Sequence, residues 1–189
     1  SSQATVLVNL GNIDLERGRI GAAAEAYDLA LALARETGSR WSAALALGNR
    51  GILRHFDEDL EGAAIDMKEA VDLFSESGDR RGEGYFRLHI AAVYADSKSP
   101  DAARQMLDQG GQLLEALGDP AGSPLASLVS AHVHHQLTPS AVARQEAERA
   151  LGAAQVADSG ASWVERSADV RLAAELLRRS LSSLTSAVS

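Results

Sequence analysis

The feature that most constrains this chain is an internal repeat with a period of 40 residues. Asn9 and Gly11 recur as Asn49 and Gly51, without a gap. Since so many matches would rarely stay in phase over 120 residues by chance, the period predicts an array of similar supersecondary units. Further matches at this offset are Ala23 with Ala63, Tyr27 with Met67, Ala30 with Ala70, Leu31 with Val71, and Gly38 with Gly78 and then Gly118.

The later copies keep the register with looser matches. In the third copy His89 stands at the position of the two asparagines, and Ala91 stands at that of the two glycines. The fourth copy keeps Ala131, Ala143 and Ala150. The repeats are therefore predicted at residues 1–38, 39–78, 79–118 and 119–158.

Each copy contains two stretches with helical periodicity. Ala23, Tyr27 and Ala30 lie at i, i+4 and i+7, the spacing of one helix face. The glycines at 38, 78 and 118 suit the left-handed residue after a helix, and the prolines at 100, 124 and 139 suit a first helical turn. The predicted helices span 3–17, 20–37, 40–56, 60–77, 80–97, 100–117, 124–137, 140–157 and 162–182.

These helices predict an all-α fold, a right-handed α-solenoid of about four antiparallel helical hairpins. We expect one domain over residues 1–189, closed by a capping helix at 162–182, with a Ser-rich end that frays from Ser180 and a tail at 183–189. Ser1 matches Trp41 of the next copy, so the first helix lacks its opening turn. The chain is therefore predicted to be a fragment of a longer protein.

Composition excludes several classes of function. The chain has no cysteine, which excludes disulfides, thiolate metal ligands and a cysteine nucleophile. Its formal net charge is −8 and its only lysines are Lys68 and Lys98, which argues against nucleic-acid binding. No apolar run is long enough to span a membrane, so a cytoplasmic location is expected. The preference for arginine over lysine and the many alanines suggest a bacterial, GC-rich source.

The first copy resembles the tetratricopeptide repeat family. The residues at that family's consensus spacing are Leu7, Leu10, Gly11, Gly18, Ala23, Tyr27 and Ala30. The resemblance covers residues 3–157, although the family's usual period is 34 and each hairpin here is about six residues longer. Such long repeats are similar to those of spindle-orientation adaptors and of bacterial signalling proteins. Two departures are Arg50, where a core leucine is usual, and Gly110-Gly111, which we expect to interrupt the second helix of copy three.

The resemblance implies that the first helix of each hairpin lines a concave groove that binds a protein or peptide. An asparagine at the position of Asn9 and Asn49 would hold the backbone of an extended peptide, because its amide both donates and accepts. The alternative is a structural asparagine that tethers a neighbouring hairpin. The candidate binding residues are Asn9, Asn12, Asn49, Ile52, His55, Phe56, Tyr85, His89, His132 and His135.

No catalytic, cofactor or metal site is predicted. The sequence has no Gly-rich phosphate loop, GxSxG or HExxH motif. His132, His134 and His135 form a cluster, but no carboxylate or thiol lies near them in the sequence. We therefore expect these histidines to contact solvent or a partner.

The leading hypothesis is an interaction scaffold within a larger bacterial signalling or regulatory protein. The alternative is a sensor domain that binds a small ligand or signal peptide and regulates an attached effector. Self-association through the end faces is a third hypothesis. A large apolar groove would favour the sensor, and a shallow groove of mixed polarity would favour the scaffold.

Overall fold

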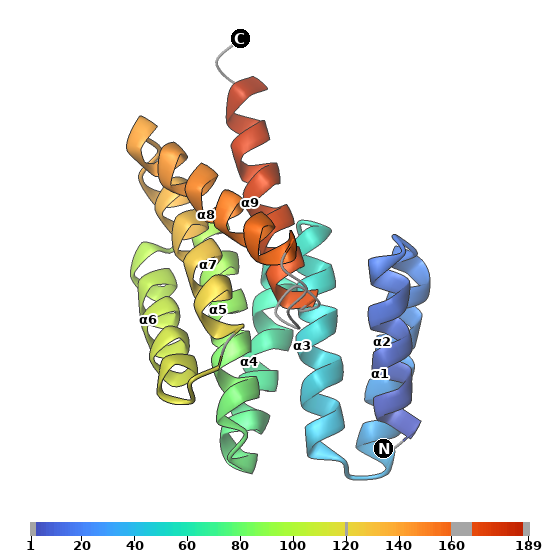
Figure 1. Cartoon of the computed structure of the whole chain (residues 1–189). Helices are drawn as coiled ribbons and strands as arrows, with labels where there is room; N and C mark the ends of the chain where they lie inside the picture. Colours follow the sequence, from blue (N-terminus) through green and yellow to red (C-terminus); the bar gives the residue numbers. More distant parts are fainter. Residues whose placement is uncertain (1–2, 120, 160–167, 187–189) are drawn as a thin grey trace. The chain divides into compact units, whose positions relative to one another are not determined.

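A computed structural model describes residues 3–119, 121–159 and 168–186 of the chain (Figure 1). Within these ranges it contains nine helices and no strand, so the predicted all-α fold is confirmed. The helices are α1 (Gln3–Glu16), α2 (Ile20–Glu36), α3 (Arg40–Phe56), α4 (Leu60–Ser77), α5 (Arg80–Asp96), α6 (Pro100–Ala116), α7 (Gly122–Leu137), α8 (Ala141–Ser159) and α9 (Ala168–Ser186).

A left-handed residue follows each of the first six helices, and these residues are 20 positions apart. Gly18, Gly38, Gly78 and Gly118 have positive φ angles, as glycine readily does. Glu58 and Lys98 occupy the same place in the other two turns, with φ of 64° and 58°. Each 40-residue repeat is therefore two 20-residue halves, each formed by one helix and its turn. The residues with positive φ are Gly18, Gly38, Glu58, Gly78, Lys98 and Gly118.

The chain forms two compact units, Ser1–Phe86 and Arg87–Ser189, which we call the first unit and the second unit. In the first unit α1 packs on α2, α2 on α3 and α3 on α4, and α1 also contacts α3. In the second unit α7 packs against α6, α8 and α9. Successive helices thus contact their neighbours, as in a helical-repeat arrangement, while the single domain over residues 1–189 stays a prediction.

Close approach of two helices explains the repeated glycine. A Cβ atom at Gly11 would lie 2.5 Å from Cε1 of Tyr27, and one at Gly51 would lie 2.6 Å from Cγ of Met67. Both large partners are fully buried. The offset of 40 residues therefore repeats a packing contact in three dimensions as well as a sequence pattern.

Two expectations need correction, and one lies outside the described residues. α6 runs unbroken through Gly110 and Gly111. The chain is helical through Ser186, and Ser180 is buried and accepts a hydrogen bond from Gln136, so fraying from Ser180 onwards was wrong. The predicted start of the capping helix at residue 162 falls within 160–167, which the structure does not describe.

Candidate functional site

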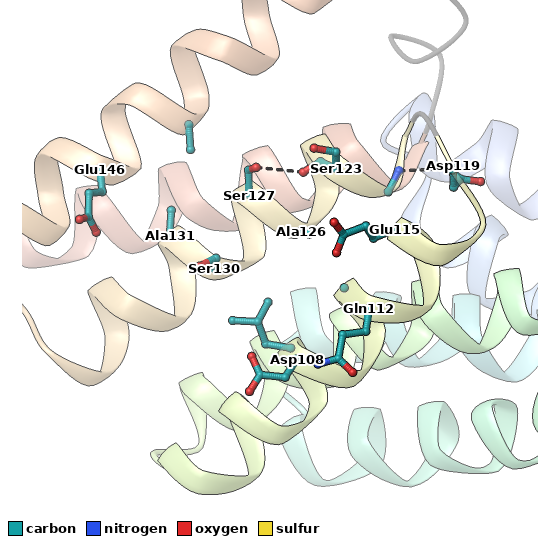
Figure 2. A pocket seen from close by; sticks show the side chains of 15 residues that line it. Asp108, Gln112, Glu115, Asp119, Ser123, Ala126, Ser127, Ser130, Ala131 and Glu146 are labelled. Atoms are coloured by element: carbon teal, nitrogen blue, oxygen red, sulfur yellow. Dashed lines mark hydrogen bonds between the residues drawn. The ribbon is translucent and has the colours of Figure 1, made fainter.

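The second unit contains an open groove of about 890 Å³ over α7 (Figure 2). Ser123, Ser127 and Ser130 form its floor, at i, i+4 and i+7 along one face of that helix. The Ser127 hydroxyl donates to the backbone carbonyl of Ser123 at 2.9 Å, a bond that Figure 2 also shows. Small side chains on the floor leave room for a group that enters from solvent.

The walls of the groove are acidic. α6 contributes Asp108 and Glu115, and α8 contributes Glu146. Asp119 lies at the end of the groove, where its carboxylate accepts from the backbone N–H of Gly122 at 3.0 Å. No lysine or arginine lines the groove among the described residues, and neither Asp108 nor Glu115 has an ion-pair partner in that part of the chain. The groove therefore attracts cations.

The groove stays open because small residues replace large ones. A Cβ atom added to Gly111 of α6 would meet no atom within 4 Å. The residue two repeats earlier is Leu31, which is buried in the first unit. Ser127 of α7 likewise stands where the first unit has the buried Leu47. The groove therefore lacks the large apolar side chains that the first unit buries at the equivalent positions.

The equivalent place in the first unit is bridged by an arginine. Arg50 of α3 donates from Nε and Nη2 to the two oxygens of Asp66 on α4, at 2.7 and 2.8 Å. Its Nη1 donates to Asp28 on α2 at 2.8 Å. The hydrogen bonds to Asp66 raise the pKa of Arg50 above its ordinary value, against the opposing effect of burial. One guanidinium group thus links all three helices.

A second cation also contacts Asp66. Nη1 of Arg54 lies 3.3 Å from Oδ2 of Asp66, the oxygen that accepts from Nε of Arg50. The counterpart in the second unit is His134, whose Nδ1 lies 2.6 Å from Oε2 of Glu146. Both interactions join the same two repeat positions, so the second unit keeps this part of the network.

The ten candidate residues that the sequence indicated lie outside this groove. Asn9 is exposed and Asn49 is half-buried, whereas the third member of the row, His89, is 1% exposed. Oδ1 of Asn12 accepts from the hydroxyl of Tyr27 at 2.8 Å, and Phe56 is half-buried. The other candidates are buried, namely Ile52, His55, Tyr85, His132 and His135. The role of all ten residues in partner binding stays a prediction.

Two carboxylates that are distant in the sequence lie close to the histidine cluster in the structure. Nε2 of His132 lies 2.8 Å from Oδ1 of Asp96, and Glu146 contacts His134. Asp96 is 36 positions from His132 in the chain, and Glu146 is 12 positions from His134. The fold of the helices brings each pair together. Among the described residues, no group of three or more His, Cys, Asp or Glu side chains is arranged to hold a metal ion.

His135 is the most isolated member of the cluster. It is buried, and neither ring nitrogen makes a hydrogen bond of normal geometry. Burial lowers the pKa of His135 below its ordinary value, and the nearby His132 and Arg144 lower it further. A weak interaction with the backbone of Ser180 opposes them. His135 is therefore a neutral core side chain, whereas its neighbour His134 faces solvent.

Sequence comparisons add no relative. The chain matches no protein-family model, and a search of curated proteins finds no match. None of the described helices is both long enough and apolar enough to cross a membrane.

The groove cannot be recognised from the sequence because its lining residues carry no distinctive chemistry. Serines, alanines and scattered carboxylates are common on the surfaces of helices. A signal was nevertheless present in the register. Two repeat periods after Asp28 and Asp66 stand Asp108 and Glu146. Two periods after Arg50 stands a serine.

Proposed function

We propose that this chain is a binding module of the tetratricopeptide type and that the groove over α7 holds a segment of a protein partner. The observation that carries this proposal is the groove itself, which is open, has a volume of about 890 Å³ and has walls from two helices and a floor from a third. A role within a larger bacterial signalling or regulatory protein belongs to the proposal and rests on the resemblance alone.

The lining supports a peptide more than an enclosed small molecule. Small-molecule sites are concave and mostly apolar, with a few convergent polar groups. Here hydroxyls and carboxylates, such as Ser127 and Glu115, alternate with Ala126 and Leu107 along the length of the groove. This mixed polarity favours the scaffold over the alternative of a small-ligand sensor.

The contacts of the lining serines support binding over catalysis. Nucleophilic catalysis needs a hydroxyl within hydrogen-bonding reach of a base. Ser127 instead donates to a backbone carbonyl, and no histidine lines the groove among the described residues.

Selection from a random dodecapeptide library, with the intact chain immobilised, tests the proposal. Ser127 is exposed on the floor, so Ser127→Trp should fill the groove without disturbing the core, and selected peptides should bind this variant at least about tenfold more weakly. The matched control is Gln105→Trp, on an exposed face of α6 outside the groove. Peptides that bind Ser127→Trp unchanged, or that lose affinity only for an Asn9/Asn49 double alanine variant, would contradict the groove as the site.

A further inference from the structure

The first unit provides an internal template for what the groove binds. There, a guanidinium group lies between Asp28 and Asp66 and uses three nitrogens, Nε, Nη1 and Nη2 of Arg50. Asp66 is 4% exposed, so this carboxylate is satisfied inside the protein and not by water. The template shows which chemistry two carboxylates at these repeat positions accept.

The register that relates the units is supported by packing contacts. A Cβ atom at Gly82 would lie 2.7 Å from Phe74, and one at Gly122 would lie 2.6 Å from Leu114, which is the same contact one period later. His134 also contacts the carboxylate of Glu146, as Arg54 contacts that of Asp66 two periods earlier. The positions compared below are therefore equivalent in packing as well as in sequence.

The second unit keeps both carboxylates and lacks the cation. Asp108 and Glu146 stand at the positions of the two aspartates, and both line the groove. The exposed Ser130 stands at the position of Arg50. In Figure 2, Ser130 lies on α7 between Glu146 on α8 and Asp108 on α6.

We propose that the groove binds an arginine side chain of a protein partner, with its guanidinium group between Asp108 and Glu146 and above Ser130. The incoming group takes the place that Arg50 takes in the first unit. This inference rests on the proposed function and names the partner chemistry of the same groove.

Geometry selects arginine over lysine. A guanidinium presents its N–H groups in a planar fork that can donate to carboxylates on two helices at once, as Arg50 does. A lysine ammonium is a single point of charge and cannot reproduce the paired contact. Glu115 and Asp119 add negative charge along the groove, so a segment with further basic residues is attracted as well.

The neighbouring histidine leaves room for this contact. His134 bonds to Oε2 of Glu146. In the first unit Asp66 accepts from Arg50 and Arg54 together. Glu146 can therefore bind His134 and an arriving guanidinium in the same shared manner.

The direct test is a titration of the intact chain with two heptapeptides, acetylated and amidated, composed of Gly, Ser and Ala around one central arginine or one central lysine. The arginine peptide should bind at least about tenfold more tightly, because only it makes the paired charge-assisted contact. It should shift the backbone amide resonances of Ser127 and Ser130. Equal binding of the two peptides, or no binding of either, would overturn the proposal.

Variants of the two carboxylates locate the contact. Asp108→Asn and Glu146→Gln should each weaken the arginine peptide about tenfold. Asp101→Asn on α6 and Glu148→Gln on α8 remove equal charge outside the groove and should leave its affinity unchanged. Equal loss in all four variants would show a general attraction to acidic surface and would overturn the arginine site.

Ser130→Arg is the sharpest variant, because it should place a guanidinium in the second unit as Arg50 does in the first. We expect the arginine peptide to bind it at least about tenfold more weakly and the melting temperature to rise. Ser130→Lys carries the same charge without the fork and should raise the melting temperature less. Unchanged peptide affinity, or a lower melting temperature with intact helical content, would contradict the template.

The peptide library separates the failure of this inference from the failure of the proposed function. Selected peptides without arginine that bind Ser130→Arg normally but lose affinity for Ser127→Trp would overturn the arginine site and leave the groove as a binding site. A selection with no peptide sensitive to Ser127→Trp would overturn both.

Discussion

In the first unit Arg50 lies between Asp28 and Asp66, whereas in the second unit Ser130 takes the position of this arginine and a groove opens above it. The helices and their register are the same in the two places. The comparison teaches that the same repeat positions can hold either a structural ion-pair network or an open acidic groove, depending on whether the central cation is present.

The equivalent carboxylates on α4 and α8 also differ in their exposure to solvent. The side chain of Asp66 is 4% exposed, and that of Glu146 is 44% exposed. A buried carboxylate needs its partners to remain charged in the fold, whereas an exposed one is solvated by water. We therefore expect stability to depend more on the network of Asp66 in the first unit than on the exposed Glu146 in the second.

Removal of the bridging arginine should have the largest effect. Arg50→Ser leaves the buried Asp66 with only its contact to Arg54, so the free energy of unfolding should fall by roughly 2–4 kcal/mol. Urea denaturation measures this change. The control is Arg35→Ser, which breaks the exposed pair with Glu69 and should cost under about 1 kcal/mol. Equal costs for the two variants would show that the bridge is not structural.

Neutralising the two equivalent carboxylates should change stability by different amounts in the two units. Asp66→Asn should lower the free energy of unfolding by about 2 kcal/mol, because hydrogen bonds to a charged, buried group are lost. Glu146→Gln should lower it by less than about 1 kcal/mol, since its pair with His134 faces solvent. Chemical denaturation of both variants measures these changes. A larger loss of unfolding free energy for Glu146→Gln would show that Glu146, and not Asp66, is the carboxylate on which stability depends.

Alanine at two helical glycines should act with opposite signs. Gly51→Ala should destabilise the chain by about 1–2 kcal/mol, because its Cβ would lie 2.6 Å from Met67 and 3.2 Å from the carbonyl oxygen of Ala63. Gly111→Ala should stabilise it by about 0.5–1 kcal/mol, because the new methyl meets nothing within 4 Å and the unfolded chain loses freedom. Thermal melts measure both effects. Destabilisation by Gly111→Ala would mean that other atoms already pack against Gly111 in the groove wall.

Protonation of His135 at acid pH should destabilise the second unit, and we expect this to be the smallest of the four effects. Its pKa is lowered in the fold, so the unfolded chain takes up the proton first, and stability falls as the pH drops below the ordinary value of 6.5. His135→Leu should reduce the loss of stability between pH 7.5 and 5.5 in urea denaturation. The interval from pH 7.5 to 8.5 serves as the control, because this side chain is neutral there in both states. An unchanged acid loss in the variant would show that other groups cause it.

Local signals predicted the helices well where the repeat is regular. The expected starts of the first six helices, from residue 3 to residue 100, match those of α1 to α6, and their ends agree within one residue. This accuracy comes from the glycines and turns spaced 20 residues apart, which act on the backbone nearby. The agreement declines towards the C-terminus, where α7 begins at Gly122 and not at the predicted Pro124.

Long-range contacts explain the errors. Ser180 lies on α9, which packs against α7, and there its buried hydroxyl accepts from the side chain of Gln136, 44 residues earlier. The sequence also did not show which of the candidate binding residues are buried, for a related reason. Histidine and asparagine were selected for their chemistry, yet the position of His89 in a helix determines that it is buried, and its residue type does not.

The sequence alone determined the period, the helices and the equivalence of positions, because these depend on propensity, apolar spacing and turn residues within a few positions of each other. Tertiary structure alone decided that Arg50 bridges two neighbouring helices and that the same place in the second unit is an open acidic groove. The physical reason is that a carboxylate's partner depends on which helices pack around it, and residues 16 to 22 positions apart in the chain meet only when those helices do.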